Sequence, residues 1–170
     1  MRYWIQIAWQ YGWLPAFVLI CLWLYVSISL PGIVPQEFEA MRGSLKPGKW
    51  FIVDKRIAGD GDWKRGQVVR FRPPGAVDPD RNDPWLARIV ALPGDTVEVR
   101  DGKLLVGGQL VVWEGFEPQS DEQMPRLLVP ADHAFLLVDQ SRAGTQKRLD
   151  SRAFGMIPFL SIEGAVFGYR

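Results

Sequence analysis

The sequence predicts a mainly β domain of antiparallel strands and hairpins, placed behind one N-terminal transmembrane helix. Two observations lead to this prediction: a long uncharged segment near the N-terminus, and a series of short apolar runs separated by turn residues about every eight to twelve positions. Few stretches repeat apolar residues with a helical period, which favours an all-β domain. A chain of 170 residues has room for one modest domain and an anchor. We expect the anchor, with a preceding interfacial segment, in residues 1–36 and the β domain in residues 37–170.

The expected anchor has no charged side chain between Tyr3 and Gln36, and it is almost wholly apolar from Trp13 to Leu30. A helix over that second stretch would measure about 27 Å at about 1.5 Å per residue, close to the hydrocarbon thickness of about 30 Å. Pro31 prevents continuation of the helix, and the stretch lacks the polar face of a globular surface helix. A cleaved signal peptide is the remaining alternative, but no small-x-small site follows Leu30. We therefore predict a transmembrane helix in contact with membrane lipid.

Apolar runs after the anchor predict the strands of the β domain. The most regular region is 86–113, which we expect to form a β-meander with a turn at Pro93-Gly94. Apolar and charged residues alternate from Thr96 to Arg100, and the following Asp101-Gly102 is typical of a two-residue hairpin loop. The expected strands are 50–53, a strand around 69–71, 86–92, 96–100, 103–106, 110–113, 127–129, 134–138 and 162–167.

The composition argues against several functional classes. The formal net charge is +1, so no polyelectrolyte character indicates nucleic acid binding. His133 is the only histidine and Cys21 the only cysteine, so the sequence has no metal-ligand spacing. We expect neither a metal nor another cofactor, and Cys21 cannot form an internal disulfide.

Four segments of the expected β domain carry recognisable motifs. Arg88 to Asp95 reads R-I-V-A-L-P-G-D, and the other three are Arg65 to Phe71 (R-G-Q-V-V-R-F), Pro130 to Asp139 (P-A-D-H-A-F-L-L-V-D) and Asp150 to Gly155 (D-S-R-A-F-G). In this order they resemble the motifs of the type I signal peptidases. The resemblance covers residues from about 38 to 168 and implies a signal-peptidase-like β domain. It also implies a single-pass protein of the inner or cytoplasmic membrane whose β domain is extracytoplasmic.

The family's chemistry depends on two side chains that this sequence lacks. Family members cleave the bond after a secretory signal peptide with a serine nucleophile and a lysine general base. The lysine can accept the serine proton only when burial keeps it neutral. Aligning Met41 and Leu45 with the family's S-M-x-P-T-L motif puts Ala40 at the nucleophile position, and Ala87 stands at the general-base position before Arg88. An alanine methyl can do neither task, so the usual mechanism is absent on this alignment.

Ser44 is the alternative nucleophile if the register slips by four residues. In the simpler interpretation it replaces the motif's threonine as a turn hydroxyl. Lys46 is poorly placed as its base, because residues two apart in an extended chain are about 7 Å apart. Lys55, Lys64 or Lys103 would have to reach the site, and nothing in the sequence places them there.

The two alanines have two explanations, engineering of an inactive enzyme and natural loss of catalysis. Further departures from the family pattern favour natural loss; they occur at Gly43, Gln67, Val138 and Arg148. We therefore predict a membrane-anchored, catalytically inactive signal-peptidase-like protein that binds extended peptide or preprotein segments in protein export, or in assembly of a secretion system or pilus. Secretion or conjugation subunits are further expected partners. The residues expected to form or support the peptide groove are Met41, Leu45, Arg88, Asp150, Ser151 and Arg152.

Two other functions stay open. One is an active serine endopeptidase that removes signal peptides with a displaced dyad around Ser44. The other is a structural membrane subunit that presents an aromatic surface to lipid or a partner, although most of these aromatic residues are expected in the core. They are Trp50, Trp63, Trp85, Trp113 and Phe116. The orientation implied by the family conflicts with the positive-inside rule, because Arg42, Lys46 and Lys49 follow the anchor and weakly favour a cytoplasmic domain.

Overall fold

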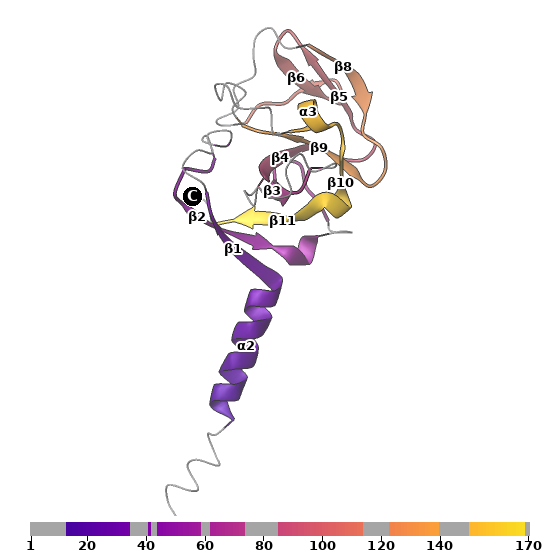
Figure 1. Ribbon diagram of the computed structural model, residues 1–170. Helices are drawn as coiled ribbons and strands as arrows, with labels where there is room; N and C mark the ends of the chain where they lie inside the picture. Colours follow the sequence, from indigo (N-terminus) through magenta and orange to yellow (C-terminus); the bar gives the residue numbers. More distant parts are fainter. Residues whose placement is uncertain are drawn as a thin grey trace, which may run out of the picture.

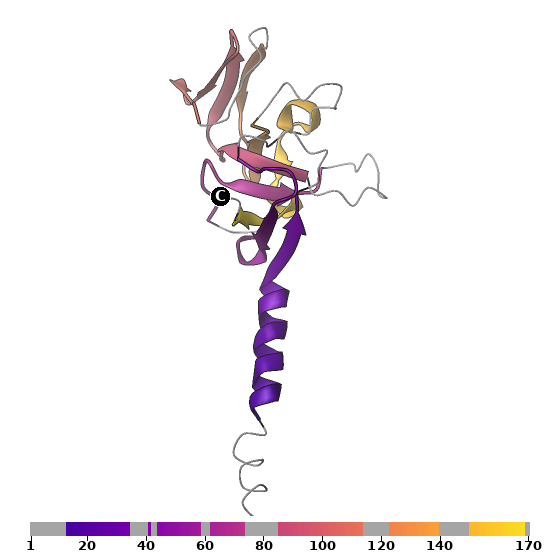
Figure 2. The ribbon, with the colours of Figure 1, turned by 90° about the vertical axis from the view of Figure 1, so that its left-hand side faces the viewer.

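The computed structural model describes residues 13–34, 41, 44–58, 62–73, 85–113, 123–139 and 150–168. It consists of a helix, α2 (Leu14–Ile28), that projects from a β domain (Figures 1 and 2). Every residue of α2 is exposed and none is charged. Within the part of the chain that the structure describes, no helix is long and apolar enough to cross a membrane. The transmembrane anchor therefore stays a prediction.

The helix ends two residues earlier than the sequence predicts. Ser29 adopts an extended backbone with φ −134° and ψ 142°, and its amide and hydroxyl both bond the carbonyl of Tyr25. Ser29 and Leu30, which we expected in the helix, are the first residues of β1 (Ser29–Ile33). The chain therefore passes from α2 into a strand of the β domain without a loop.

Most strands form one antiparallel sheet of seven strands, in the order β1-β2-β11-β3-β4-β9-β10 (Figure 1). Neighbouring strands pair over up to five residues, and β1 pairs with β2 along its whole length. Besides β1, the strands are β2 (Trp50–Asp54), β3 (Val68–Phe71), β4 (Trp85–Ala91), β9 (His133–Leu137), β10 (Ile157–Pro158) and β11 (Ile162–Phe167).

A second sheet has four strands in the order β7-β6-β5-β8. They are β5 (Thr96–Arg100), β6 (Lys103–Val106), β7 (Gln109–Leu110) and β8 (Met124–Leu128). The predicted hairpin is confirmed, because Asp101 and Gly102 have φ of 51° and 68° and join β5 to β6. Three short helices complete the described chain: η1 (Lys55–Ile57), α3 (Ser151–Phe154) and η2 (Phe159–Ser161).

The expected continuous meander over 86–113 is wrong at its first turn. β4 pairs with β3 and β9, whereas β5 pairs with β6 and β8 in the other sheet. The turn at Pro93-Gly94 moves the chain between sheets, because Gly94 and Asp95 bond the backbone of Val129 instead of continuing a hairpin. The strand expected at 110–113 is also short and ends at Leu110.

The buried apolar side chains form two core clusters. The first includes Met41, Leu45 and Ala87, and it takes most of its side chains from strands of the seven-stranded sheet. The second lies between the two sheets and includes Val90 of β4, Leu137 of β9 and Val97 of β5. The strand β4 contributes to both clusters: Leu86, Ala87 and Ile89 belong to the first, and Val90 and Ala91 at the end of the strand belong to the second.

One face of β1, β2 and β11 carries large exposed apolar side chains. We call Ile33, Trp50, Ile52 and Phe167 the apolar stripe; each is between 38% and 66% exposed. Ile33 lies opposite Trp50 and Ile52 lies opposite Phe167, so the four side chains share one face. The stripe lies on β1, which continues directly from α2, on its neighbour β2, and on β11 at the other side of β2.

Candidate functional site

Four side chains from separate segments meet in what we call the polar cluster: Ser44, Arg88, Trp113 and Asp139. The Asp139 side chain has no exposed surface and that of Arg88 is 11% exposed. Arg88 Nε donates to Asp139 Oδ1 at 2.9 Å, and its Nη2 donates to Oδ2 at 3.0 Å. Trp113 Nε1 donates to Oδ1 at 2.7 Å. The Ser44 hydroxyl donates to Oδ2 and also accepts a bond from Arg88 Nη2.

The fold places Arg88 and Asp139 side by side through strand pairing. Arg88 lies in β4 opposite Leu137 of β9, two residues before Asp139. Arg88 Nη1 reaches further and donates to the carbonyl of Gly66 at 2.7 Å. Gly66 has φ of +86°, a conformation that favours glycine, in the turn before β3. The guanidinium of Arg88 therefore joins four segments of the chain.

The turn from Met41 to Leu45 is held against this cluster. The Leu45 and Ser44 amides donate to the Met41 carbonyl at 2.6 and 2.9 Å. The Asp139 amide donates to Met41 Sδ at 3.4 Å. Met41 and Leu45, which we expected to line the peptide groove, are fully buried in the first core cluster. Their part in a groove stays a prediction.

The predicted general-base position lies next to the cluster but on the other face of β4. Ala87 is opposite Val69 of β3, has no exposed surface, and packs in the first core cluster. Arg88 is its neighbour, so the two side chains point to opposite faces of the strand. The predicted nucleophile position, Ala40, lies outside the described residues, and so does Arg148.

The motif residues Asp150, Ser151 and Arg152 join α3 to β9. Asp150 caps α3 by accepting from the Arg152 amide at 3.0 Å, and it pairs with the Arg152 guanidinium. Asp150 Oδ2 also accepts from the Val138 amide at 3.3 Å, and Ser151 Oγ accepts from the Leu136 amide at 2.9 Å. These bonds support the strand whose end carries Asp139. Their contribution to a peptide groove stays a prediction.

The aromatic residues divide between surface and core. Trp50 is exposed in the apolar stripe, whereas Trp63 is buried. Trp85 packs edge-on against Phe71 and Phe154. Core packing is therefore confirmed for Trp63 and Trp85, while Phe116 lies outside the described residues.

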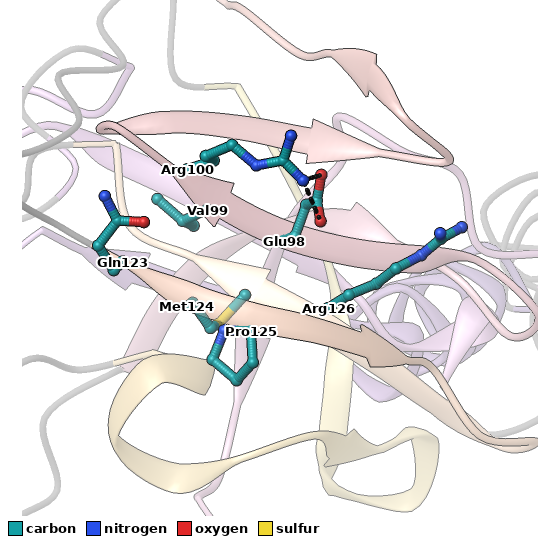
Figure 3. A pocket seen from close by; sticks show the side chains of 7 residues that line it. All are labelled: Glu98, Val99, Arg100, Gln123, Met124, Pro125 and Arg126. Carbon is teal, nitrogen blue, oxygen red and sulfur yellow. Dashed lines mark hydrogen bonds and ion pairs between the residues drawn. The ribbon is translucent and has the colours of Figure 1, made fainter.

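Two cavities are lined by residues other than the four of the polar cluster, although the larger one includes Gly66, which accepts from Arg88. One of about 650 Å³ is lined by residues 64–68 and 165–168. The other, of about 350 Å³, lies between β5 and β8 (Figure 3). Figure 3 shows Arg100 beside it donating to the Glu98 carboxylate, at 3.1 Å. Neither cavity is lined by Ser44, Ala87 or Asp139.

Sequence reasoning missed Trp113 and Asp139 as site residues. Asp139 had a signal, since it is a carboxylate at the end of the apolar run from Ala134 to Val138. A buried carboxylate there requires a cationic or hydrogen-bonding partner. Trp113 had no comparable signal, because its contact with Asp139 depends on how the two sheets pack.

Comparison with known proteins gives a consistent result. The protein-family model described as "Signal peptidase, peptidase S26" matches residues 9–169 of this chain. A signal peptidase I from Leptolyngbya laminosa is 28% identical over 150 residues, which is 86% of this chain and 71% of that protein. The signal peptidase I of Pseudomonas aeruginosa is 27% identical, with 85% and 67% covered.

Two further matches are partial. Thylakoidal processing peptidase 1 of Arabidopsis thaliana is 44% identical over 91 residues, covering 52% of this chain and 25% of that protein. The crystal structure of a signal peptidase I from Enterococcus faecalis V583 covers 61% of this chain and 96% of that chain, with 24% identity and a TM-score of 0.47.

Proposed function

The chain belongs to the signal peptidase family, peptidase S26, and from this premise we propose that it binds extended preprotein segments without cleaving them. Membership connects the chain with signal peptide processing and with preproteins that bear signal peptides. Peptide binding without cleavage goes beyond family membership and is our proposal. The observation that carries it is the fully buried methyl group of Ala87 at the general-base position.

The surroundings of Ala87 support a lost general base. A lysine serves as a base only where an apolar environment favours its neutral form. Ala87 lies in such an environment, the first core cluster, but an alanine methyl cannot accept a proton. With Ala40 at the nucleophile position of the same alignment, both proton-transfer partners are missing.

The contacts of Ser44 argue against the displaced dyad. Its hydroxyl donates to Asp139 and accepts from Arg88. A carboxylate offers about four acceptor positions. Four donor atoms already bond the Asp139 oxygens: two nitrogens of Arg88, one of Trp113, and the Ser44 hydroxyl. These bonds support a structural role for the Ser44 hydroxyl, because a nucleophile needs a base that can receive its proton.

We further propose that α2 and the segment before it anchor the domain to the membrane, with the β domain extracytoplasmic. The exposed and uncharged surface of α2 supports this, because a helix in water would bury at least one apolar face. The apolar stripe supports it too, since exposed apolar patches mark contacts with lipid or protein. A role in export or in assembly of a secretion system would use this position beside translocated preproteins.

The test uses the full chain in detergent with a fluorescent signal-peptide substrate and a preprotein. We expect the parent chain to bind the peptide, as seen by fluorescence anisotropy, and to leave the preprotein intact. The double variant Ala40→Ser/Ala87→Lys should gain cleavage, because it restores nucleophile and base in register. Ala40→Ser/Ala91→Lys is the matched control, since Ala91 is an equally buried alanine of β4. Cleavage by the parent that Ser44→Ala abolishes would make the chain an active peptidase and overturn the proposal.

A further inference from the structure

We propose that Trp113 is a positioning residue for the peptide-binding site: its indole holds Asp139 and Arg88 in the geometry that fixes the turn from Met41 to Leu45. The inference rests on the proposed function, because it concerns the peptide affinity of that same site. It concerns a residue outside every motif on which the resemblance to signal peptidases depends.

Trp113 contacts both charged members of the polar cluster. Its Nε1 donates to Asp139 Oδ1 at 2.7 Å, and Arg88 Cζ lies 5.6 Å from the centroid of its ring. A cation over an indole ring is attracted to it, most strongly where water is excluded. Asp139 has no exposed surface, so the donor supplied by Trp113 satisfies an oxygen that water does not reach.

The position of Asp139 determines the position of the turn. Asp139 bonds this turn twice, through its amide to Met41 Sδ and through Oδ2 to the Ser44 hydroxyl. Met41 is also the sequence neighbour of position 40, the nucleophile position of the family alignment. Loss of the indole donor would let the Asp139 carboxylate turn towards Arg88 alone, and the bond to Ser44 would shift with it.

Trp113 also joins the two sheets. It lies three residues after β7 of the four-stranded sheet and packs against the second core cluster, while Asp139 follows β9 of the seven-stranded sheet. The 2.7 Å bond between them therefore connects segments that strand pairing does not connect. Peptide affinity should depend on this bond although Trp113 has no place in the signal-peptidase motifs.

The first variant is Trp113→Phe, which keeps an aromatic ring over Arg88 but removes the N–H donor. Its matched control is Trp85→Phe, because Trp85 is also partly buried and packs only through its ring with Phe71 and Phe154 in the contacts described. We expect Trp113→Phe to raise the peptide Kd about tenfold, as for loss of one hydrogen bond to a charged group. Trp85→Phe should change the Kd less than twofold.

A second variant keeps the shape of the tryptophan side chain. Benzothienylalanine at position 113 has the outline of tryptophan with sulfur in place of the N–H group, so packing is retained while the donor is lost. It should reproduce the tenfold rise. In the Ala40→Ser/Ala87→Lys background, either change should also lower kcat/KM for preprotein cleavage, because Met41, the sequence neighbour of position 40, is held by Asp139.

The outcomes separate this inference from the proposed function. If the parent chain binds no peptide, the proposed function fails. If the parent binds and the benzothienyl variant binds equally well, the positioning role of Trp113 is overturned while the proposed function stands. A loss of affinity that Trp85→Phe matches would likewise reduce Trp113 to a packing residue.

Discussion

Breaking the ion pair between Arg88 and Asp139 should destabilise the chain by about 3–5 kcal/mol from either side, because the remaining charge stays buried without its partner. Asp139→Leu leaves the guanidinium bonded only to the Gly66 carbonyl and the Ser44 hydroxyl among the contacts described, at a side chain that is 11% exposed. Arg88→Met leaves a fully buried carboxylate with Trp113 and Ser44 as its side-chain donors.

The double variant Arg88→Met/Asp139→Leu removes both charges and should cost much less than the sum of the two single changes, which is about 6–10 kcal/mol. A buried ion pair replaced by apolar residues of similar volume is often close to neutral in stability. The coupling energy between the two positions should therefore be at least about 3 kcal/mol, at the upper end of measured couplings.

The assay is urea unfolding of the full chain in mild detergent, followed by tryptophan fluorescence and near-ultraviolet circular dichroism. The exposed pair of Arg100 and Glu98 is the control, because its nitrogen and oxygen lie 3.1 Å apart but the Arg100 side chain is 67% exposed. Arg100→Met should cost at most about 1 kcal/mol. The reasoning would be refuted if the single changes at Arg88 and Asp139 lowered the free energy of unfolding no more than this control. It would also be refuted if their two effects simply added in the double variant.

Three further predictions concern the strands and turns that support the site. Gly164→Ala should lower the free energy of unfolding by about 3 kcal/mol, because φ is +157° and a Cβ would lie 2.3 Å from the Asp54 carbonyl oxygen; an unchanged thermal midpoint would contradict this. Arg56→Gln removes the hydrogen bond that holds the pKa of Asp54 below its usual value of 3.8. Because the folded pKa is depressed, this stabilisation is present above the unfolded value and is lost as pH falls through the folded one. Acid titration followed by circular dichroism should thus show a parent-to-variant difference that is constant near neutrality, begins to shrink near pH 3.8, and vanishes below the lowered pKa of folded Asp54. Ser151→Ala removes the 2.9 Å bond from the Leu136 amide, which should cost about 1–3 kcal/mol and speed hydrogen exchange at that amide; unchanged exchange would show that another group accepts the bond.

Local patterns predicted the parts of the fold that depend on local physics. The hairpin at Asp101-Gly102 follows from the positive φ that a two-residue loop requires, and both residues have it. Alternation from Thr96 to Arg100 predicted that Val97 and Val99 share one face, and both side chains are buried in the second core cluster.

Local sequence patterns did not predict which distant segments pair with each other. Ser29 and Leu30 are uncharged like the helix before them, so hydropathy assigned them to the helix, whereas partners in β2 draw them into the sheet. The exchange of sheets at Pro93-Gly94 depends on Val129, far along the chain. The polar cluster was missed for the same reason, since its four members come from four segments that only the tertiary fold assembles.

The direct junction between α2 and β1 has a mechanical consequence. Ile28 is the last helical residue and Ser29 the first residue of the strand, so no flexible tether lets the β domain move independently of the helix. Five paired residues then fix β1 to β2, over a strand length of about 17 Å. The junction therefore holds the seven-stranded sheet, and with it Arg88 of the polar cluster, at a nearly constant height above the end of α2. A peptide segment would have to be extended at that height in order to bind at the site. The distance between the site and the end of α2 therefore selects what this protein can bind, as side-chain chemistry does.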